Sequence, residues 1–207
     1  MATIHRATIT PTKLELLTAW LPGCHWYPGE DVKDLQRVGA CRLDDPAGEV
    51  GVEILLVRAE HGPLAHTPLT YRGAPLDGAE PHLIGTTEHD VLGTRWVYDA
   101  VADPVFLETV TAVIRTGGTE AEEFVETEDG PQRRDPAMRL RGSGWARAGA
   151  PAGRVVRLEE GDPAVVVAEG VRLEVRRVLS GEPAAVPLHL TGTWAEDAPP
   201  EVLVELC

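Results

Sequence analysis

The stretch "HLIGTTEHDVLGTRWVYDAVADP", residues 82–104, decides which fold the sequence predicts. Two runs rich in Thr, Val, Ile, Trp and Tyr flank the polar residues Glu88, His89 and Asp90, as in two strands joined by a turn. Asp103 followed by Pro104 then has the residue types of a helix start, a capping side chain before a proline in the first helical position. Polar residues belong at such a turn whatever their function, so a β-hairpin that leads into a helix is favoured over a catalytic cluster.

The residues before this stretch continue the strand pattern. The runs "QRVGACRLDD" (36–45), "GEVGVEILLVRAE" (48–60) and "PLAHTPLTYRG" (63–73) are separated by the turn-forming segments "DPAG", "EHGP" and "GAPLDG". This spacing leaves no room for crossover helices and predicts an antiparallel meander. Cys41 lies in the middle of a strand and is expected to be a small core residue.

Two helices are predicted from start and stop signals. In residues 12–23, Thr12 can cap a helix, Glu15 can complete a capping box, and Pro22-Gly23 ends it. In residues 103–118, Asp103 and Pro104 start a helix that ends at a Gly-Gly pair. The apolar positions expected to face the core are Leu14, Leu17 and Leu21 in the first helix and Val105, Leu107, Val110 and Ile114 in the second.

The C-terminal half is predicted to be rich in strands. Residues 119–144 are expected to hold a short strand, an exposed loop at 129–136 and a second strand. The segment "WARAGAPAG" (145–153) has linker composition, and residues 154–194 contain four further strand patterns. The sequence therefore predicts a main α+β domain, residues 1–145, and a β-rich extension, residues 146–207, packed on it.

Composition excludes several classes of protein. The formal net charge of −14 and a pI near 4.9 argue against binding to nucleic acid or to an anionic membrane surface. The N-terminal residues resemble no secretory signal, and no apolar run approaches the roughly 20 residues of a membrane helix. Three cysteines without CxxC spacing indicate reduced thiols, so a cytoplasmic location is expected.

No motif for catalysis or metal binding is convincing. His61, His66, His82 and His89 lack the spacing of a zinc site, and the adjacent pair Cys24-His25 would point in different directions on a loop. Ser143 lacks the strand-turn-helix context of a nucleophile elbow. The sequence therefore predicts no catalytic residue, no metal and no cofactor.

Five segments carry a family resemblance: "TITPTKLELLTAWLPG", "GEVGVEILLV", "TPLTYRGAPL", "LIGTTEHDVLGTRWVYDAVADPVF" and "RGSG". Over about residues 1–145 they resemble the N-terminal cap region of actinobacterial maltokinases and glucosamine kinases. The resemblance is closer still to stand-alone cap-like proteins, some of which are labelled α-glucan branching proteins. It implies a cystatin-like, curved antiparallel sheet with helices packed against it, which agrees with the element pattern described above.

The resemblance continues into the tail, where it implies a departure from the kinases. "VVRLEEGDPAVVVAEGVRLEVRRVLSGE" (155–182) has the layout of the kinase N-lobe hairpin, and Glu174 falls where the kinases carry an ATP-binding lysine. Only 33 residues follow Glu174, so a kinase C-lobe is expected to be absent. The protein is therefore predicted neither to bind ATP nor to phosphorylate sugars. A non-enzyme is favoured, and an activity other than that of a kinase stays an alternative.

Two functional hypotheses follow. The first is a non-catalytic binding or interaction protein with a protein partner, for example a carbohydrate-metabolism enzyme, in α-glucan or trehalose metabolism. Its candidate anchors are Trp26, Tyr27, Tyr71, Arg72, Arg95 and Trp96, because aromatic residues and arginine dominate interface hot spots. A position in the core is the alternative for Trp26 and Trp96. The alternative is a small-ligand binder, an enzyme or a remnant of a sugar kinase that uses the concave sheet face, with His89, Arg95 and Asp99 as the candidate lining. Trp96 is expected in the core.

Overall fold

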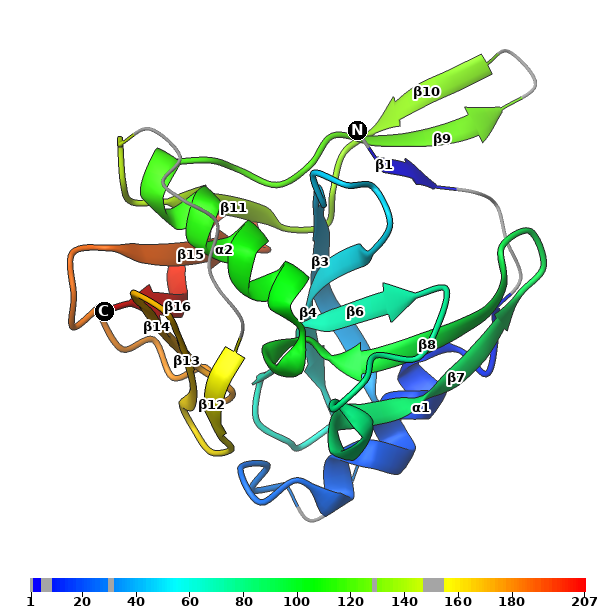
Figure 1. Cartoon of the computed structure of the whole chain (residues 1–207), viewed down its shortest axis with the longest axis horizontal. Coiled ribbons are helices and arrows are strands. Elements are labelled where there is room, and N and C mark those ends of the chain that lie inside the picture. The colour runs from blue at the N-terminus through cyan, green and yellow to red at the C-terminus, as the bar shows by residue number, and fades with distance from the viewer. Residues whose placement is uncertain (1, 5–8, 30–31, 128–129, 147–154) are drawn as a thin grey trace.

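A curled antiparallel sheet of seven strands organises the protein (Figure 1). In the computed structural model, which describes residues 2–4, 9–29, 32–127, 130–146 and 155–207, the strand order is β2-β7-β8-β6-β4-β3, with β5 also paired to β4. The strands are β2 (Ile9–Thr10), β3 (Gln36–Leu43), β4 (Gly51–Arg58), β5 (Ala65–His66), β6 (Leu69–Arg72), β7 (Leu83–His89) and β8 (Gly93–Asp99). Together with two α-helices, this sheet confirms the predicted α+β class.

The central strand β4 is buried on both faces because successive side chains of a strand point to opposite sides. Val52, Ile54 and Leu56 enter one hydrophobic cluster, whereas Leu55 and Val57 enter another. The first cluster includes residues of helix α2 (Pro104–Thr116), and the second includes residues of helix α1 (Lys13–Trp20). We call these two sides of the sheet the α2 face and the α1 face.

Helix α1 (Lys13–Trp20) begins as the sequence predicts. Thr12 accepts a hydrogen bond from the Glu15 backbone N–H, and the Glu15 carboxylate accepts one from the Thr12 N–H, which completes the capping box. Leu17 and Leu21 are fully buried against the sheet, while Leu14 is half-buried. The helix therefore covers only one end of the α1 face.

Helix α2 (Pro104–Thr116) also has the predicted boundaries. The Asp103 side chain accepts a hydrogen bond from the Val105 N–H, and Gly117 ends the helix with φ of 66° in the left-handed region. Leu107, Val110 and Ile114 are buried as expected. Val105 is half-buried, and its place in the core is taken by Phe106, which is fully buried.

A second, six-stranded antiparallel sheet packs on the other side of α2, in the order β11-β15-β16-β14-β13-β12. Its strands are β11 (Arg139–Gly142), β12 (Val155–Glu159), β13 (Ala164–Ala168), β14 (Val171–Val175), β15 (His189–Thr193) and β16 (Glu201–Leu206). The hairpin predicted after the cap is β13–β14 within this sheet. Strand β16 was missed by the sequence patterns, although its run "EVLVEL" is mostly apolar and lies between β14 and β15.

A small sheet contains β1 (Ala2–Ile4), β9 (Glu123–Thr127) and β10 (Gly130–Arg134). The exposed loop predicted at 129–136 is wrong over residues 130–134, because they pair with β9 as an antiparallel strand. Residue 129 lies outside the described part of the chain. The sequence pattern did not indicate this strand, because the side chains of β10 are mostly polar and exposed. Its pairing with β9 uses backbone groups, which every residue type except proline can supply in full.

The predicted division at residues 145 and 146 stays a proposal. Residues on both sides of it contribute to the hydrophobic cluster of the α2 face, including Ile54 and Ile114 before it and Leu173 and Leu190 after it. Strand β11 also pairs with β15 across the division. The linker predicted at 145–153 lies outside the described residues from 147 onward.

A buried polar contact joins the second sheet to the first. Arg177, just after β14, is 1 % exposed, and its Nη2 lies 2.6 Å from Oδ2 of Asp99 at the end of β8. The Arg177 guanidinium also lies 5.1 Å from the centre of the Trp26 ring. Next to it, the His66 Nδ1 is 2.8 Å from the Arg176 carbonyl oxygen. The oppositely charged side chains of Arg177 and Asp99 thus connect the two sheets.

We expect His66 to make the protein less stable as the pH falls. Burial lowers the pKa of His66 to about 3, while an unfolded histidine has a pKa near 6.5. The unfolded chain therefore takes up a proton first, and stability is lost progressively from pH 6.5 down to about 3. Denaturant titrations between about pH 6.5 and 5 should show a smaller pH dependence in His66→Gln than in the wild type. Equal slopes would contradict this role of His66.

Candidate functional site

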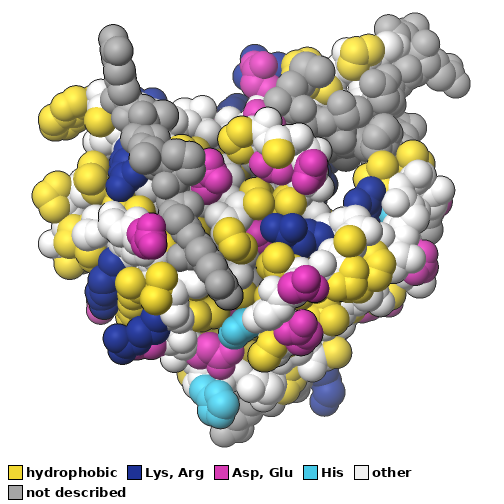
Figure 2. Space-filling model, in the orientation of Figure 1, with side chains coloured by type: hydrophobic (Ala, Val, Ile, Leu, Met, Phe, Trp, Pro, Cys, Tyr) yellow, Lys and Arg dark blue, Asp and Glu magenta, His cyan; other side chains and the backbone are white. Residues whose placement is uncertain are grey.

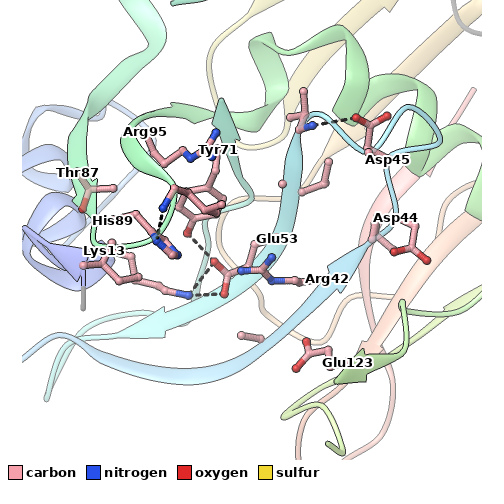
Figure 3. Close-up of a pocket in the computed structure, with 18 of the residues that line it drawn as sticks. Lys13, Arg42, Asp44, Asp45, Glu53, Tyr71, Thr87, His89, Arg95 and Glu123 are labelled. Atoms are coloured by element: carbon pink, nitrogen blue, oxygen red, sulfur yellow. Dashed lines mark hydrogen bonds and ion pairs between the residues drawn. The ribbon is translucent and has the colours of Figure 1, made fainter. Parts of the chain in front are cut away.

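A pocket of about 510 Å³ lies on the α1 face of the curled sheet, beyond the end that α1 covers (Figure 3). Strands β3, β4, β6, β7 and β8, the loop between β3 and β4, and residues of β9 and β10 enclose it. Its lining mixes apolar residues with charged ones of both signs, namely Lys13, Arg37, Arg42, Asp44, Asp45, Glu49, Glu53, His89, Arg95, Glu123 and Arg134. Its volume falls in the range of about 300–1,000 Å³ that is usual for ligand sites.

Glu53 forms the charged floor of the pocket. Its side chain is 6 % exposed, and the Lys13 Nζ donates hydrogen bonds to its two oxygens at 2.5 and 2.8 Å. The Tyr71 hydroxyl donates a third at 2.5 Å. Figure 3 shows Lys13 and Tyr71 converging on Glu53 from different elements. Lys13 comes from the first turn of α1, so the ion pair also attaches the helix to the sheet.

These contacts fix the protonation states of the floor. Burial alone would raise the pKa of the Glu53 carboxyl, but the charge of Lys13, the hydrogen bonds from Lys13 and Tyr71 and the charge of Arg42 together lower it. Burial, followed by the charge of Glu53 and the hydrogen bond to it, raises the pKa of Tyr71 well above its usual value. Glu53 is therefore ionised and Tyr71 neutral near pH 7, and neither is poised to exchange a proton at that pH.

His89 is held at one wall of the pocket by the hairpin turn. Its Nδ1 accepts hydrogen bonds from the backbone N–H groups of Val91 and Leu92 at 3.2 and 3.1 Å. In the neutral ring, Nδ1 is thus the acceptor and Nε2 carries the proton. The side chain is only 15 % exposed although it lies at a hairpin turn, because these hydrogen bonds direct the ring partly inward.

The rim of the pocket contains acidic residues of two kinds. The carboxylate of Asp45 stabilises the β3–β4 loop, because its oxygens accept hydrogen bonds from the backbone N–H groups of Ala47, Glu49 and Val50. Glu123 on β9 is buried, and burial raises the pKa of its carboxyl despite the nearby charges of Arg134 and Arg42. Asp45 thus stabilises the turn, whereas Glu123 lies close to arginines.

The structure brings together three of the predicted site residues, and these are Tyr71, His89 and Arg95. Arg95 on β8 lies opposite Thr87 on β7 and reaches the pocket from the wall that also holds His89. The remaining candidates are elsewhere.

The other predicted site residues are engaged in the fold. Trp26 and Tyr27 are 9 % and 7 % exposed and pack edge to face in the hydrophobic cluster of the α1 face. Arg72 donates to both oxygens of Asp103, each at 2.7 Å. Asp99 is buried with Arg177, as described above. None of these four lines the pocket, although their proposed role as binding residues is untested.

The expectation of a core position for Trp96 is wrong. Trp96 is only half-buried and belongs to neither hydrophobic cluster. Its neighbour Val97 points to the α1 face and is 1 % exposed. Trp96 points the other way, because side chains alternate along β8. Strong β-propensity in "RWVYDAV" indicated a strand but not which side chains the layers would cover.

Lys13, Arg42 and Glu53 were missed by sequence reasoning. Glu53 did carry a signal, since it is the one charged residue inside the run "GVEILLV". A charge in a strand buried on both faces requires a partner. The partner, Lys13, lies 40 residues away on a helix, so no local pattern could identify it.

The arrangement offers groups that can bind a ligand, and two of the catalytic arrangements considered from the sequence can be checked against it. Burial, followed by the charge of Asp99, raises the pKa of the Cys24 thiol to about 12, which removes the adjacent Cys24-His25 pair as an activated nucleophile. Within the described ranges, no group of three or more His, Cys, Asp or Glu residues is placed to hold a metal ion. The pocket offers guanidinium donors, carboxylate acceptors and an aromatic side chain around a neutralised floor.

Charges of both signs are also mixed on the outer surface. Figure 2 shows Lys, Arg, Asp and Glu side chains interspersed with hydrophobic ones over the visible face, without one extended basic patch. Among the described residues, no helix has the length and apolar character needed to cross a membrane.

The fold and pocket define an α+β protein built on a curled antiparallel sheet with a ligand-sized hollow on its α1 face. Residues 20–103 match the family model of the maltokinase N-terminal cap domain. This match confirms the family resemblance over β3 to β8, which carry Arg42, Glu53, Tyr71, His89 and Arg95. No curated protein matches the sequence. The extension of the resemblance to residues 1–19 and 104–145 stays a prediction.

Proposed function

We propose that the protein is a non-catalytic binding protein related to the maltokinase cap, and that the pocket on the α1 face is its ligand site. The observation that carries this proposal is the pocket itself, a hollow of about 510 Å³ whose charged floor is already neutralised and hydrogen-bonded. Glu53 needs no ligand to balance its charge, so the floor is complete before a ligand binds. Preformed, partly apolar pockets with a few fixed polar groups are the usual form of small-molecule sites.

A screen of small metabolites by protein NMR tests this proposal. The set should include neutral mono- and disaccharides, sugar phosphates and sugar acids. Saturable amide shifts confined to the pocket-lining residues support a ligand site, and their absence for every compound contradicts it. Gly51 provides an occluding variant, because it lies opposite Tyr71 on the α1 face and a Cβ there first meets the Tyr71 side chain at 3.4 Å.

Gly51→Leu should therefore abolish the amide shifts while leaving the fold intact. Gly23→Leu is the matched control, because Gly23 lies outside the pocket and a Cβ there meets nothing within 4 Å. Loss of the shifts in both variants, or retention in both, would contradict binding in this pocket.

The absence of kinase activity is the second part of the proposal. Glu174, which the resemblance places at the position of the ATP-binding lysine, lies on β14 with its carboxylate 2.7 Å from Arg172. A carboxylate repels phosphate where the kinases present an ammonium group.

We expect no ATP binding by this hairpin. Magnesium-ATP titrated into the purified protein should give no heat of binding and no shift in melting temperature. Glu174→Lys tests the cause, because it restores the kinase residue type, and Glu182→Lys provides the same charge change on an exposed residue. Micromolar ATP binding by the wild type would contradict the non-catalytic assignment.

A link to α-glucan or trehalose metabolism is part of the proposal and is supported only by the cap-domain match. A protein partner, such as an enzyme of carbohydrate metabolism, is the second candidate. The tip of the β7–β8 hairpin favours it, because Val91 and Leu92 are 59 % and 48 % exposed there. A pull-down with wild type and Val91→Asp separates the two: a stoichiometric partner lost only in the variant indicates a docking surface.

A further inference from the structure

The arginines of the pocket have no carboxylate partners. In the part of the chain that the structure describes, the side chains of Arg37, Arg42, Arg95 and Arg134 form no hydrogen bond or ion pair. Several arginines elsewhere are paired even where exposed, for example Arg139 with Glu120 at 2.8 Å, whereas Arg141 is exposed and unpaired. The sequence has 33 acidic residues, so partners are abundant. What sets the pocket apart is that four unpaired guanidinium groups lie around one hollow.

Arg95 is the most constrained of the four. Its Nε is buried and has no hydrogen-bond partner. Its Nη1 lies so close to Gly73 that a Cβ at that position would be 2.9 Å away. The glycine at the end of β6 thus makes room for the guanidinium group. A buried donor without an acceptor is destabilising, so the guanidinium group of Arg95 has unused hydrogen-bonding capacity.

Arg42 is held on the other side of the floor. It lies directly opposite Glu53 in the β3–β4 pairing and is half-buried. The Glu53 oxygens already accept hydrogen bonds from Lys13 and Tyr71. Arg42 therefore stays available as a donor, and Figure 3 shows Arg42 and Arg95 on different sides of Glu53.

The acceptors in the pocket indicate a second feature of the ligand. Glu49 in the β3–β4 loop is exposed at the rim. Its carboxylate can accept a hydrogen bond from a carbon-bound hydroxyl group at some distance from an oxyanion, which an isolated inorganic anion does not offer. A ligand that satisfies both sets of groups has an oxyanion at one end and hydroxyl groups at the other.

We propose that the pocket binds a small hydroxyl-bearing organic anion, with a phosphoryl or carboxylate group held by Arg95 or Arg42. The planar fork of arginine matches both groups, since each presents two oxygens to paired N–H donors. This inference rests on the proposed function, because it names the ligand class of the same pocket.

Calorimetric titration with four probes tests the ligand class. Glucose 6-phosphate represents a phosphoryl group, glucuronate a carboxylate, glucose the neutral counterpart, and inorganic phosphate the anion without the hydroxyl groups of a sugar. We expect at least one of the two sugar anions to bind at least about tenfold more tightly than glucose and than inorganic phosphate, since hydrogen bonds to charged groups contribute about 1.5–3 kcal/mol. Comparison of the two sugar anions identifies the oxyanion.

Arginine variants locate the binding. Arg95→Gln and Arg42→Gln should be compared with Arg141→Gln, which removes the same charge from an exposed, unpaired arginine outside the pocket. We expect at least one pocket variant to weaken the anion about tenfold or more and the control to leave it unchanged. Equal losses in all three variants, or none, would overturn the inference.

The outcomes also separate this inference from the proposed function. Binding of glucose as tightly as its anionic counterparts, with pocket amide shifts, would overturn the anion inference and leave the ligand site standing. Tighter binding of inorganic phosphate than of either sugar anion would overturn the role of the hydroxyl groups. No binding of any probe, together with no shifts in the metabolite screen, would overturn both.

Discussion

Arg177→Ala is expected to lower the free energy of unfolding by about 3–5 kcal/mol, because it leaves the Asp99 carboxylate buried without its counter-charge. Asp99 is only 4 % exposed, and its Oδ2 accepts the 2.6 Å hydrogen bond from Arg177. The substitution also removes the cation from the Trp26 ring. Chemical denaturation of wild type and variant measures the loss.

Two further variants show whether the charge is the cause. Arg172→Gln is the control, since Arg172 forms an ion pair with Glu174 that is 42 % and 27 % exposed, and it should cost about 1 kcal/mol or less. The double variant Asp99→Leu with Arg177→Met removes both charges. The pair is incompletely satisfied, with Asp99 Oδ1 and Arg177 Nε and Nη1 lacking partners among the described residues. The double variant should therefore be more stable than Arg177→Ala, and lower stability would contradict the account.

Asp103→Ala is expected to cost about 3 kcal/mol, more than the roughly 1 kcal/mol that its capping role alone predicts. The Asp103 side chain is fully buried, caps α2 through Val105, and accepts two hydrogen bonds from Arg72. Removing it breaks the cap and leaves Arg72, which is 20 % exposed, without its partner. Thermal and denaturant unfolding measure the combined loss.

Asp103→Asn separates these two effects. Its side-chain oxygen can still accept the hydrogen bond from Val105 N–H, but the charge opposite Arg72 is gone. Stability should fall between those of the wild type and Asp103→Ala. An exposed control is Asp135→Ala, because Asp135 is 85 % exposed in its ion pair with Arg139 and should change stability by less than about 1 kcal/mol. An Asp103→Ala protein as stable as this control would contradict the double role.

Local signals predict much of this fold. Thr12 and Glu15 start α1, Asp103 and Gly117 bound α2, and the hairpin at residues 82–104 is present as β7, β8 and the start of α2. These features depend on residues close together in the chain, where spacing and side-chain type determine the backbone. Local signals do not determine which side chains the other layers of the fold cover, as the half-buried Trp96 shows.

The contacts that make the site and those that join the two sheets are non-local. Lys13 and Glu53 are 40 residues apart, and Asp99 and Arg177 are 78 apart. Only the folded sheet brings each pair together. The same holds for β10 and β16, whose partners are set by sheet topology and not by their own patterns. Sequence reasoning placed Tyr71, His89 and Arg95 among the candidates but could not identify the charged floor beneath them.

A crystal structure of the protein grown with the tightest-binding probe tests the central claim most directly. The account predicts electron density for the probe in the pocket on the α1 face, with its oxyanion within hydrogen-bond distance of Arg95 or Arg42. Lys13 and Tyr71 should keep their contacts with Glu53. Density for the probe at another surface, with the pocket empty although the probe saturates the protein in solution, would contradict the account.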